Sequence, residues 1–218
     1  MRLINAPPSP YGRKIAIALK EKQIAFETYY DQPWGDTTCT VDYSPLEQLP
    51  ILVLDTGKAI YDSTYILEWL ELRYPEPPLL PTDVAGILGA KLLQMLGERV
   101  MEAVHQITFE LKRSYPSEDW VSRQTRKVRK GLDEIDRLVC GRCPAVGDAI
   151  TVGDIAVGST VLVFSFLISN DFAPDLEVLR WRHDRRDLET FIGALENRQS
   201  FQETKPAMMD VDLQAVVC

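Results

Sequence analysis

The sequence Ser9-Pro10-Tyr11-Gly12-Arg13-Lys14-Ile15 follows a short apolar segment, Leu3-Ile4, and opens a helical pattern that runs to about Glu21. This order predicts a strand-to-helix turn that carries a hydroxyl group. Pro10 suits the first helical position, where the missing N–H of proline costs nothing, and Ser9 suits the N-cap before it. The first N–H groups of a helix lack internal partners and point beyond its N-terminus. The turn suits a thiolate or another small anion, while Ser9 acting only as a cap is the simpler interpretation.

The composition is that of an ordinary globular protein, and 218 residues are enough for one large domain or two small ones. A formal net charge of −8 and a pI near 4.9 argue against nucleic acid and an anionic membrane as principal partners, because both are bound through positive surface. No uninterrupted apolar run reaches the roughly 18 residues of a membrane span, and the start of the chain lacks the apolar core of a secretory signal. We therefore expect a cytoplasmic protein.

Cys140 and Cys143 form a pair whose spacing occurs in redox and zinc sites. A redox pair of this kind belongs at a strand-to-helix turn early in a βαβ unit, whereas this pair follows a long helical pattern. Zinc needs about two further ligands, but the two histidines are far away in the sequence and no second close cysteine pair exists. The sequence therefore predicts no metal site, and a redox role of the pair stays open.

Residues 1–75 alternate short β-like runs with helical ones, which predicts a small α/β domain. Asp55-Thr56-Gly57 has the pattern of a hairpin turn, so we expect a mixed sheet rather than a wholly parallel one. The proline-dense residues 76–83 predict a linker, since proline continues neither a helix nor a central strand. The expected strands are residues 2–5, 25–30, 51–54 and 58–61, and the expected helices are residues 10–21 and 63–73.

Residues 84–206 show long helical patterns and predict an all-α domain, followed by a tail at residues 207–218. Thr151-Val152-Gly153-Asp154 has the capping-box pattern, in which the two end residues each bond the backbone N–H of the other. We assign this motif to folding. The expected helices are residues 84–114, 118–139 and 152–169, with shorter ones between residues 176 and 198.

Two further motifs in the first domain combine a structural interpretation with a functional one. Gln48-Leu49-Pro50 places proline at the start of an apolar strand, where it can lie at a sheet edge. The backbone of Leu49 can there pair with an extended peptide. Asp62-Ser63 opens a helix, so capping is its plain role, but a hydroxyl, free helical amides and a carboxylate together also match an amino-acid head group.

These motifs occur in the order found in the cytosolic glutathione transferases, and the chain resembles that family from Met1 to about Pro206. Each motif alone is weak, whereas their order and spacing together are specific. The matching features are the active-site turn at residues 9–14, the cis-proline strand at Gln48-Leu49-Pro50, the Asp62-Ser63 pair, the capping box at residues 151–154 and the closing stretch at residues 198–206.

The resemblance implies an α/β thioredoxin-like N-terminal domain, an all-α C-terminal helical-bundle domain and a homodimer. It implies glutathione as co-substrate and no metal. Ser9 would donate a hydrogen bond to the glutathione sulfur, and Leu49, next to Pro50, would pair with the cysteinyl backbone. Asp62 and Ser63 would hold the γ-glutamyl end, and Gln48 would reach the glycyl end.

The resemblance also implies that the thiolate attacks a hydrophobic electrophile. His105, Phe109 and Trp120 are aromatic candidates for the acceptor pocket, although core positions explain them equally well. Because Ser9 cannot form a mixed disulfide, conjugation, isomerisation or glutathione-dependent cleavage is favoured over thiol transfer. A glutathione-dependent isomerase and a β-etherase-like lyase remain as alternatives. A binding or regulatory module that kept the fold without the chemistry is a further hypothesis.

Overall fold

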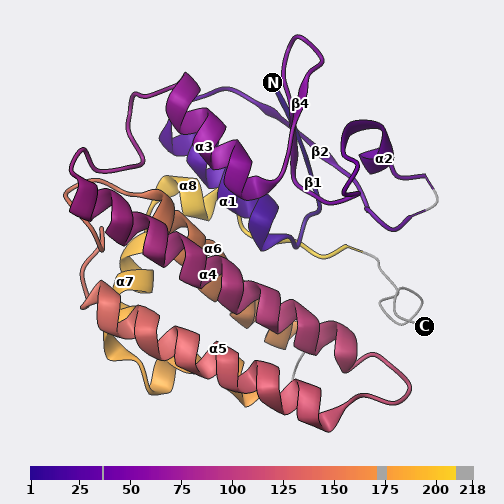
Figure 1. The fold of residues 1–218 in the computed structure, drawn as a ribbon, viewed down its shortest axis with the longest axis vertical. Coiled ribbons are helices and arrows are strands. Elements are labelled where there is room, and N and C mark those ends of the chain that lie inside the picture. The colour runs from indigo at the N-terminus through magenta and orange to yellow at the C-terminus, as the bar shows by residue number, and fades with distance from the viewer. Residues whose placement is uncertain (36, 171–175, 210–218) are drawn as a thin grey trace. The chain divides into compact units, whose positions relative to one another are not determined.

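The computed structural model describes residues 1–35, 37–170 and 176–209 (Figure 1). Its internal contacts divide the described chain into two units. The first comprises Met1–Leu80 together with Asn197–Met209, and the second comprises Pro81–Glu196. The contacts thus group Asn197–Met209 with the N-terminal part, whereas the sequence pattern places residues up to 206 with the helical part.

The first unit is built on a four-stranded sheet with the strand order β2-β1-β3-β4. β1 pairs with β2 in parallel, whereas β1 with β3 and β3 with β4 pair antiparallel. The sheet is therefore mixed, as the hairpin pattern predicts, and Gly57 supplies a left-handed residue with φ of 83° in the turn. The strands are β1 Arg2–Asn5, β2 Glu27–Tyr30, β3 Ile51–Val53 and β4 Ala59–Ile60.

Among the described residues of this unit, the helices α1 and α3 lie side by side (Figure 1). α1 buries Ile15, Ile17 and Leu19, while α3 buries Ile66 and Leu70. Burial of this apolar surface removes it from water and stabilises the unit. The helices are α1 Pro10–Glu21, α2 Thr40–Tyr43, α3 Ser63–Arg73 and α8 Gln199–Gln202.

Among its described residues the second unit contains helices and no strands, and α4 packs against both α5 and α6 (Figure 1). α6 is long and apolar enough to cross a membrane, but 72% of it is buried inside the protein. α6 is therefore buried to the extent expected of a helix in a protein core. The helices are α4 Val84–Glu110, α5 Glu118–Val139, α6 Val152–Ser169 and α7 Arg186–Glu196, with short 3-10 turns at Glu177–Leu179 and Trp181–His183.

The predicted capping box at the start of α6 is confirmed. Asp154 N donates to the Thr151 hydroxyl, and the Asp154 carboxylate accepts from Thr151 N at 2.7 Å. The carboxylate also accepts from Ala145 N at 2.9 Å. Asp154 therefore fixes the loop before α6 as well as the helix start, which the local sequence pattern does not reveal.

Lys22 fastens the end of α1 to the chain that follows α3. Its side chain is 0% exposed, and its Nζ lies 3.1 Å from the Glu71 carboxylate. Nζ also donates to the carbonyls of Tyr74 at 2.7 Å and Pro77 at 3.0 Å. The beginning of the predicted linker is thereby bound to the first unit.

Lys22→Met should destabilise the protein by about 3 kcal/mol, because it leaves the Glu71 carboxylate and two carbonyls without their buried cation. Urea denaturation measures the loss. Lys58→Met, at an exposed lysine, is the control and should change the free energy of unfolding by less than about 0.5 kcal/mol. Equal effects of the two substitutions would show that the buried lysine is not an anchor.

Candidate functional site

The sheet register brings two of the predicted segments to one edge of the sheet. Ile4 on β1 pairs with Ile51 on β3 in an antiparallel arrangement. In such a pair the end of one strand lies beside the start of the other. The chain therefore leaves β1 toward Ser9 at the same edge at which it enters β3 from Leu49.

The third predicted segment reaches this edge through the β3–β4 hairpin. Leu52 on β3 pairs with Ile60, the last residue of β4. The chain consequently leaves β4 toward Asp62 beside the start of β3, and α3 begins at Ser63. We call this edge, with the turn at Ser9, the start of β3 and the start of α3, the site edge.

Ser9 is the N-cap of α1 and is half-buried. Its Oγ accepts a hydrogen bond from Gly12 N at 3.2 Å, and its own N–H donates to the Ala6 carbonyl at 3.0 Å. A hydroxyl has one hydrogen to donate and two lone pairs that accept. Because the cap bond uses a lone pair, the hydroxyl hydrogen is still available to a ligand. The simpler interpretation of Ser9 as a cap is confirmed and leaves room for a second role.

Asn5 supports this turn, although the sequence patterns do not single it out. It ends β1 and is only 7% exposed. A Cβ built at Gly12 would lie 1.5 Å from Asn5 Oδ1, so only glycine lets the first turn of α1 approach the end of β1 this closely. A glycine in the first turn of a helix is the sequence signal that marks such an approach.

The second segment places a proline at the start of β3. Pro50 is buried, Leu49 is half-buried and Gln48 is exposed. The Leu49–Pro50 peptide bond is cis, as the resemblance implies. Leu49 packs against the buried cluster that contains Ile4 and Ile51, so its side chain serves the core. Its backbone lies at the site edge, directly before β3.

The third segment starts α3. Asp62 is exposed at the N-cap, and its Oδ1 accepts from Thr64 N at 2.8 Å and from Tyr65 N at 3.3 Å. Ser63 follows as the first helical residue and is 4% exposed. The capping role of Asp62 is confirmed. Both cap bonds use Oδ1, and a carboxylate has a second oxygen with which to bind a cation.

The three aromatic candidates for an acceptor pocket belong to the helical unit. His105 and Phe109 are four residues apart on α4 and share one helix face, whereas Trp120 is 42% exposed near the start of α5. Burial lowers the pKa of His105 to about 4. The imidazole is therefore neutral at neutral pH and offers one donor and one acceptor.

The described cysteines Cys39, Cys140 and Cys143 are in no disulfide and have different surroundings. Cys140 is exposed at the C-cap of α5 and donates to the Arg137 carbonyl at 3.1 Å, and Cys143 is half-buried. Burial, together with the Asp31 carboxylate at 3.2 Å, raises the pKa of the Cys39 thiol. Within the part of the chain that the structure describes, no group of three or more His, Cys, Asp or Glu side chains could hold a metal ion.

Comparison with known proteins identifies the family to which the chain belongs. The family model of the glutathione S-transferase N-terminal domain matches residues 3–78. The uncharacterized GST-like protein YibF of Escherichia coli K12 is 31% identical over 209 residues, which cover 94% of this chain and 98% of YibF. A probable maleylacetoacetate isomerase of Caenorhabditis elegans is 28% identical over 192 residues, covering 85% of this chain and 87% of that protein.

A solved structure is more similar still. It is a glutathione S-transferase from Methylobacterium radiotolerans in complex with glutathione sulfonate, which is 40% identical with a TM-score of 0.89 and 97% of each chain covered. The chain therefore belongs to the cytosolic glutathione S-transferase family. The predicted fold class, a thioredoxin-like α/β domain with an all-α domain, is confirmed.

Gly12→Ala should destabilise the protein by about 2 kcal/mol, because the added methyl group must displace Asn5 in a packed interior. Gly193→Ala in α7 is the matched control, since nothing lies within 4 Å of a Cβ built there. It should stabilise by about 0.5 kcal/mol through the higher helix propensity of alanine. Thermal and urea unfolding measure both. A neutral Gly12→Ala would show that Asn5 does not restrict the start of α1.

Proposed function

We propose that the site edge binds glutathione and that the turn at Ser9 stabilises its thiolate for attack on an electrophile. The observation that carries the proposal is the bonding of Ser9. Its oxygen caps α1 as an acceptor, which leaves the hydroxyl hydrogen to be donated in front of the helix N-terminus. The relative from Methylobacterium radiotolerans, solved with glutathione sulfonate, supports the choice of ligand.

The thiol needs activation because an ordinary cysteine thiol has a pKa of about 8.5 and is only a few per cent ionised at neutral pH. The positive end of the α1 dipole and the Ser9 hydroxyl both favour the anion. A lowering of the thiol pKa by about 2 units corresponds to about 2.7 kcal/mol of preferential anion binding. Two or three directed donors supply an effect of this size.

The rest of the site edge suits the peptide part of glutathione. The backbone of Leu49 pairs with the cysteinyl residue as an added strand would. The Asp62 carboxylate attracts the ammonium group of the γ-glutamyl end, while Ser63 and the N-terminus of α3 attract its carboxylate. Gln48 is exposed beside this edge and reaches the glycyl end. These four residues and Ser9, with Pro50 setting the start of β3, form the proposed binding site.

The proposed reaction is transfer of glutathione to a hydrophobic electrophile. Glutathione-dependent isomerisation is the second candidate, and it is favoured by the similarity to a probable maleylacetoacetate isomerase. An activated aryl chloride and a maleyl substrate separate the two activities. The proposal includes a cytoplasmic location, where thiols outside disulfides, such as those of the described cysteines, persist.

Ser9→Ala should lower kcat with an activated aryl chloride by about 10- to 100-fold, since it removes one directed donor to the sulfur. The dissociation constant for glutathione, measured by isothermal titration, should change less than about threefold because the peptide contacts remain. Ser117→Ala is the matched control. Ser117 also caps a helix, accepting from Trp120 N at 3.3 Å, but it lies in the helical unit.

Undiminished turnover of Ser9→Ala would show that another group activates the sulfur. Failure of the unmodified protein to bind glutathione at millimolar concentration would overturn the proposed function. Binding without turnover of either electrophile class would favour the alternative of a non-catalytic module.

We also propose that the chain forms a homodimer, with an apolar stripe on α4 in the interface. Val84, Leu88, Leu92 and Met95 recur along one side of the helix and are 72%, 65%, 40% and 43% exposed in the single chain. Apolar side chains that cluster on a surface mark interaction sites more often than scattered ones do. A second copy of the chain covers the stripe in this proposal.

Leu88→Glu should shift the protein from dimer to monomer, because it buries a charge in the proposed interface. Sedimentation equilibrium over a range of concentrations measures the change. Leu111→Glu is the control, since Leu111 is 43% exposed but follows α4 and lies outside the stripe. A monomeric unmodified protein, or a Leu88→Glu variant that stays dimeric, would contradict the proposed interface.

A further inference from the structure

The C-terminal segment Asn197–Met209 belongs to the first unit and runs along α1. We call this segment the strap. The strap makes three contacts: at the C-terminal end of α1, near the N-terminal end of α1, and at the turn that precedes α1. The strap residues proceed from Arg198 at the C-terminal end of α1 to Ala207 at the turn before Ser9, so the strap runs antiparallel to the helix.

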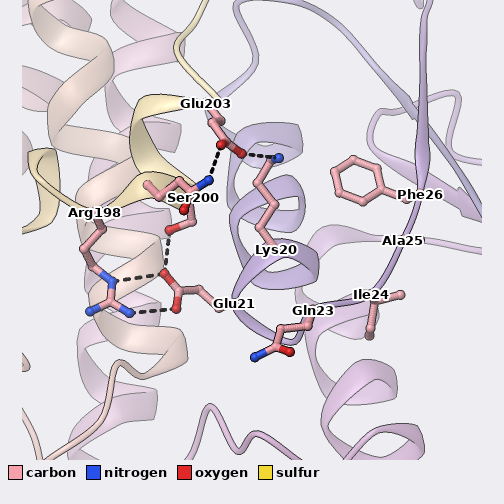
Figure 2. A pocket seen from close by; sticks show the side chains of 10 residues that line it. Lys20, Glu21, Gln23, Ile24, Ala25, Phe26, Arg198, Ser200 and Glu203 are labelled. Atoms are coloured by element: carbon pink, nitrogen blue, oxygen red, sulfur yellow. Dashed lines mark hydrogen bonds and ion pairs between the residues drawn. The ribbon is translucent and has the colours of Figure 1, made fainter.

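Ion pairs hold the strap at the C-terminal end of α1, as Figure 2 shows. Arg198 donates to both oxygens of Glu21, at 3.0 and 2.7 Å, and the Ser200 hydroxyl donates to the same carboxylate. Lys20 Nζ lies 2.7 Å from Glu203. These pairs form one wall of an open pocket of about 660 Å³, with Ile24, Ala25 and Phe26 also in its lining.

The Glu21 carboxylate stays charged in this arrangement. Burial alone would raise its pKa, but the hydrogen bonds from Arg198 and Ser200 and the charge of Arg198 outweigh burial and hold the pKa below its usual value. A carboxylate with a lowered pKa stabilises the folded state above its ordinary pKa and loses this effect as the pH falls through the lowered one. The attachment at this end is therefore complete at neutral pH.

The middle of the strap is fixed by a buried arginine. Arg13 donates from its guanidinium to the Phe201 carbonyl at 3.1 Å, and the guanidinium lies 5.8 Å from the centre of the Phe201 ring. Arg13 is 6% exposed and Phe201 is 1% exposed. Because Arg13 is the fourth residue of α1, this contact holds the N-terminal half of the helix, next to its cap Ser9.

The last contact reaches the turn itself. Ala207 N donates to the Pro7 carbonyl at 3.2 Å. Pro7 lies inside the tight turn that Ser9 N closes on the Ala6 carbonyl at 3.0 Å. The strap is thus bonded to the backbone two residues before the serine proposed to activate glutathione.

We infer that Ala207 is a positioning residue, whose backbone N–H fixes the turn before Ser9 in the orientation that directs the Ser9 hydroxyl, at the N-terminus of α1, toward the glutathione sulfur. The inference rests on the proposed function for its catalytic part. Donors aimed at a developing or bound anion act strongly only when they are held in place beforehand. The ion pairs at Glu21 and Lys20 and the contact at Arg13 fix the strap along α1. The bond from Ala207 to Pro7 then restricts the turn before Ser9.

Ala207→Pro tests the inference because proline removes the one N–H that donates to Pro7. Ala207→Ser keeps the N–H and is the matched control. Without ligand, amide hydrogen exchange in peptides that cover residues 5–14 should be about two- to tenfold faster in Ala207→Pro than in Ala207→Ser, corresponding to the loss of one hydrogen bond. Circular dichroism checks that both variants keep the fold.

The second readout is the pH dependence of kcat/KM for the electrophile, measured at saturating glutathione. Loss of stability alone would not shift this pH dependence. The acid limb, which reports ionisation of the thiol, should shift upward by about half a pKa unit in Ala207→Pro, or about 0.7 kcal/mol. Equal exchange rates in the two variants would contradict the claim that the Ala207 N–H fixes the turn before Ser9. Faster exchange with an unchanged acid limb would overturn the positioning role.

Failure of the proposed function would look different. It would appear in the unmodified protein as absence of glutathione binding, and the exchange comparison, which needs no ligand, would then decide by itself whether Ala207 fixes the turn.

Discussion

The close contact between Gly12 and Asn5 is the constraint on which the proposed site depends. It places the first turn of α1 directly against the end of β1, at a distance that no side chain at position 12 would permit. The N-terminus of α1 is thereby fixed relative to the sheet, and Ser9 caps it through its oxygen. Strand pairing then sets the other components, because β1 with β3 and β3 with β4 deliver Leu49 and Asp62 to the same edge. Sheet register brings the segments of the proposed site together.

The end of β1 and the strap, which are far apart in sequence, both hold α1 in place. Asn5 packs against the first turn of α1. The strap is attached along α1 by ion pairs, by the buried Arg13 and by one backbone hydrogen bond at Pro7. Lys22 adds a buried attachment at the end of the helix. An anion site formed by a hydroxyl at a helix N-terminus requires a donor that does not reorient when charge appears. The number of independent attachments along α1 is consistent with that requirement.

Much of the fold could be predicted because its signals are local. Ser9-Pro10 and Asp62-Ser63 are cap sequences, and the observed bounds of α1 and α3 agree with the prediction. The capping box at Thr151 and the mixed sheet were equally accessible from pattern. The family resemblance, which the comparisons confirm, added what no local pattern contains, namely glutathione as the ligand to propose. It did so through the order of several weak motifs.

The remaining features depend on contacts between distant residues. Arg198 and Glu21 are 177 positions apart, so the grouping of the strap with α1 has no local signature. The four-residue helix α2 has no side-chain cap, and its start is held by hydrogen bonds to Asp31 from Thr38 and Thr40. In the sequence Asn5 is an ordinary strand residue, and only the structure shows that Gly12 packs against it. The acceptor specificity likewise depends on side chains of the helical unit that periodicity cannot separate from its core.

The central claim is that the turn at Ser9 stabilises a glutathione thiolate, and the ultraviolet difference spectrum of the protein with glutathione, titrated from about pH 5 to 9, tests it most directly. The account predicts a thiolate band that is half-developed about 2 units below the ordinary thiol pKa of about 8.5. A bound thiol that ionises only at its ordinary pKa would contradict the account, because glutathione would then occupy the site without activation.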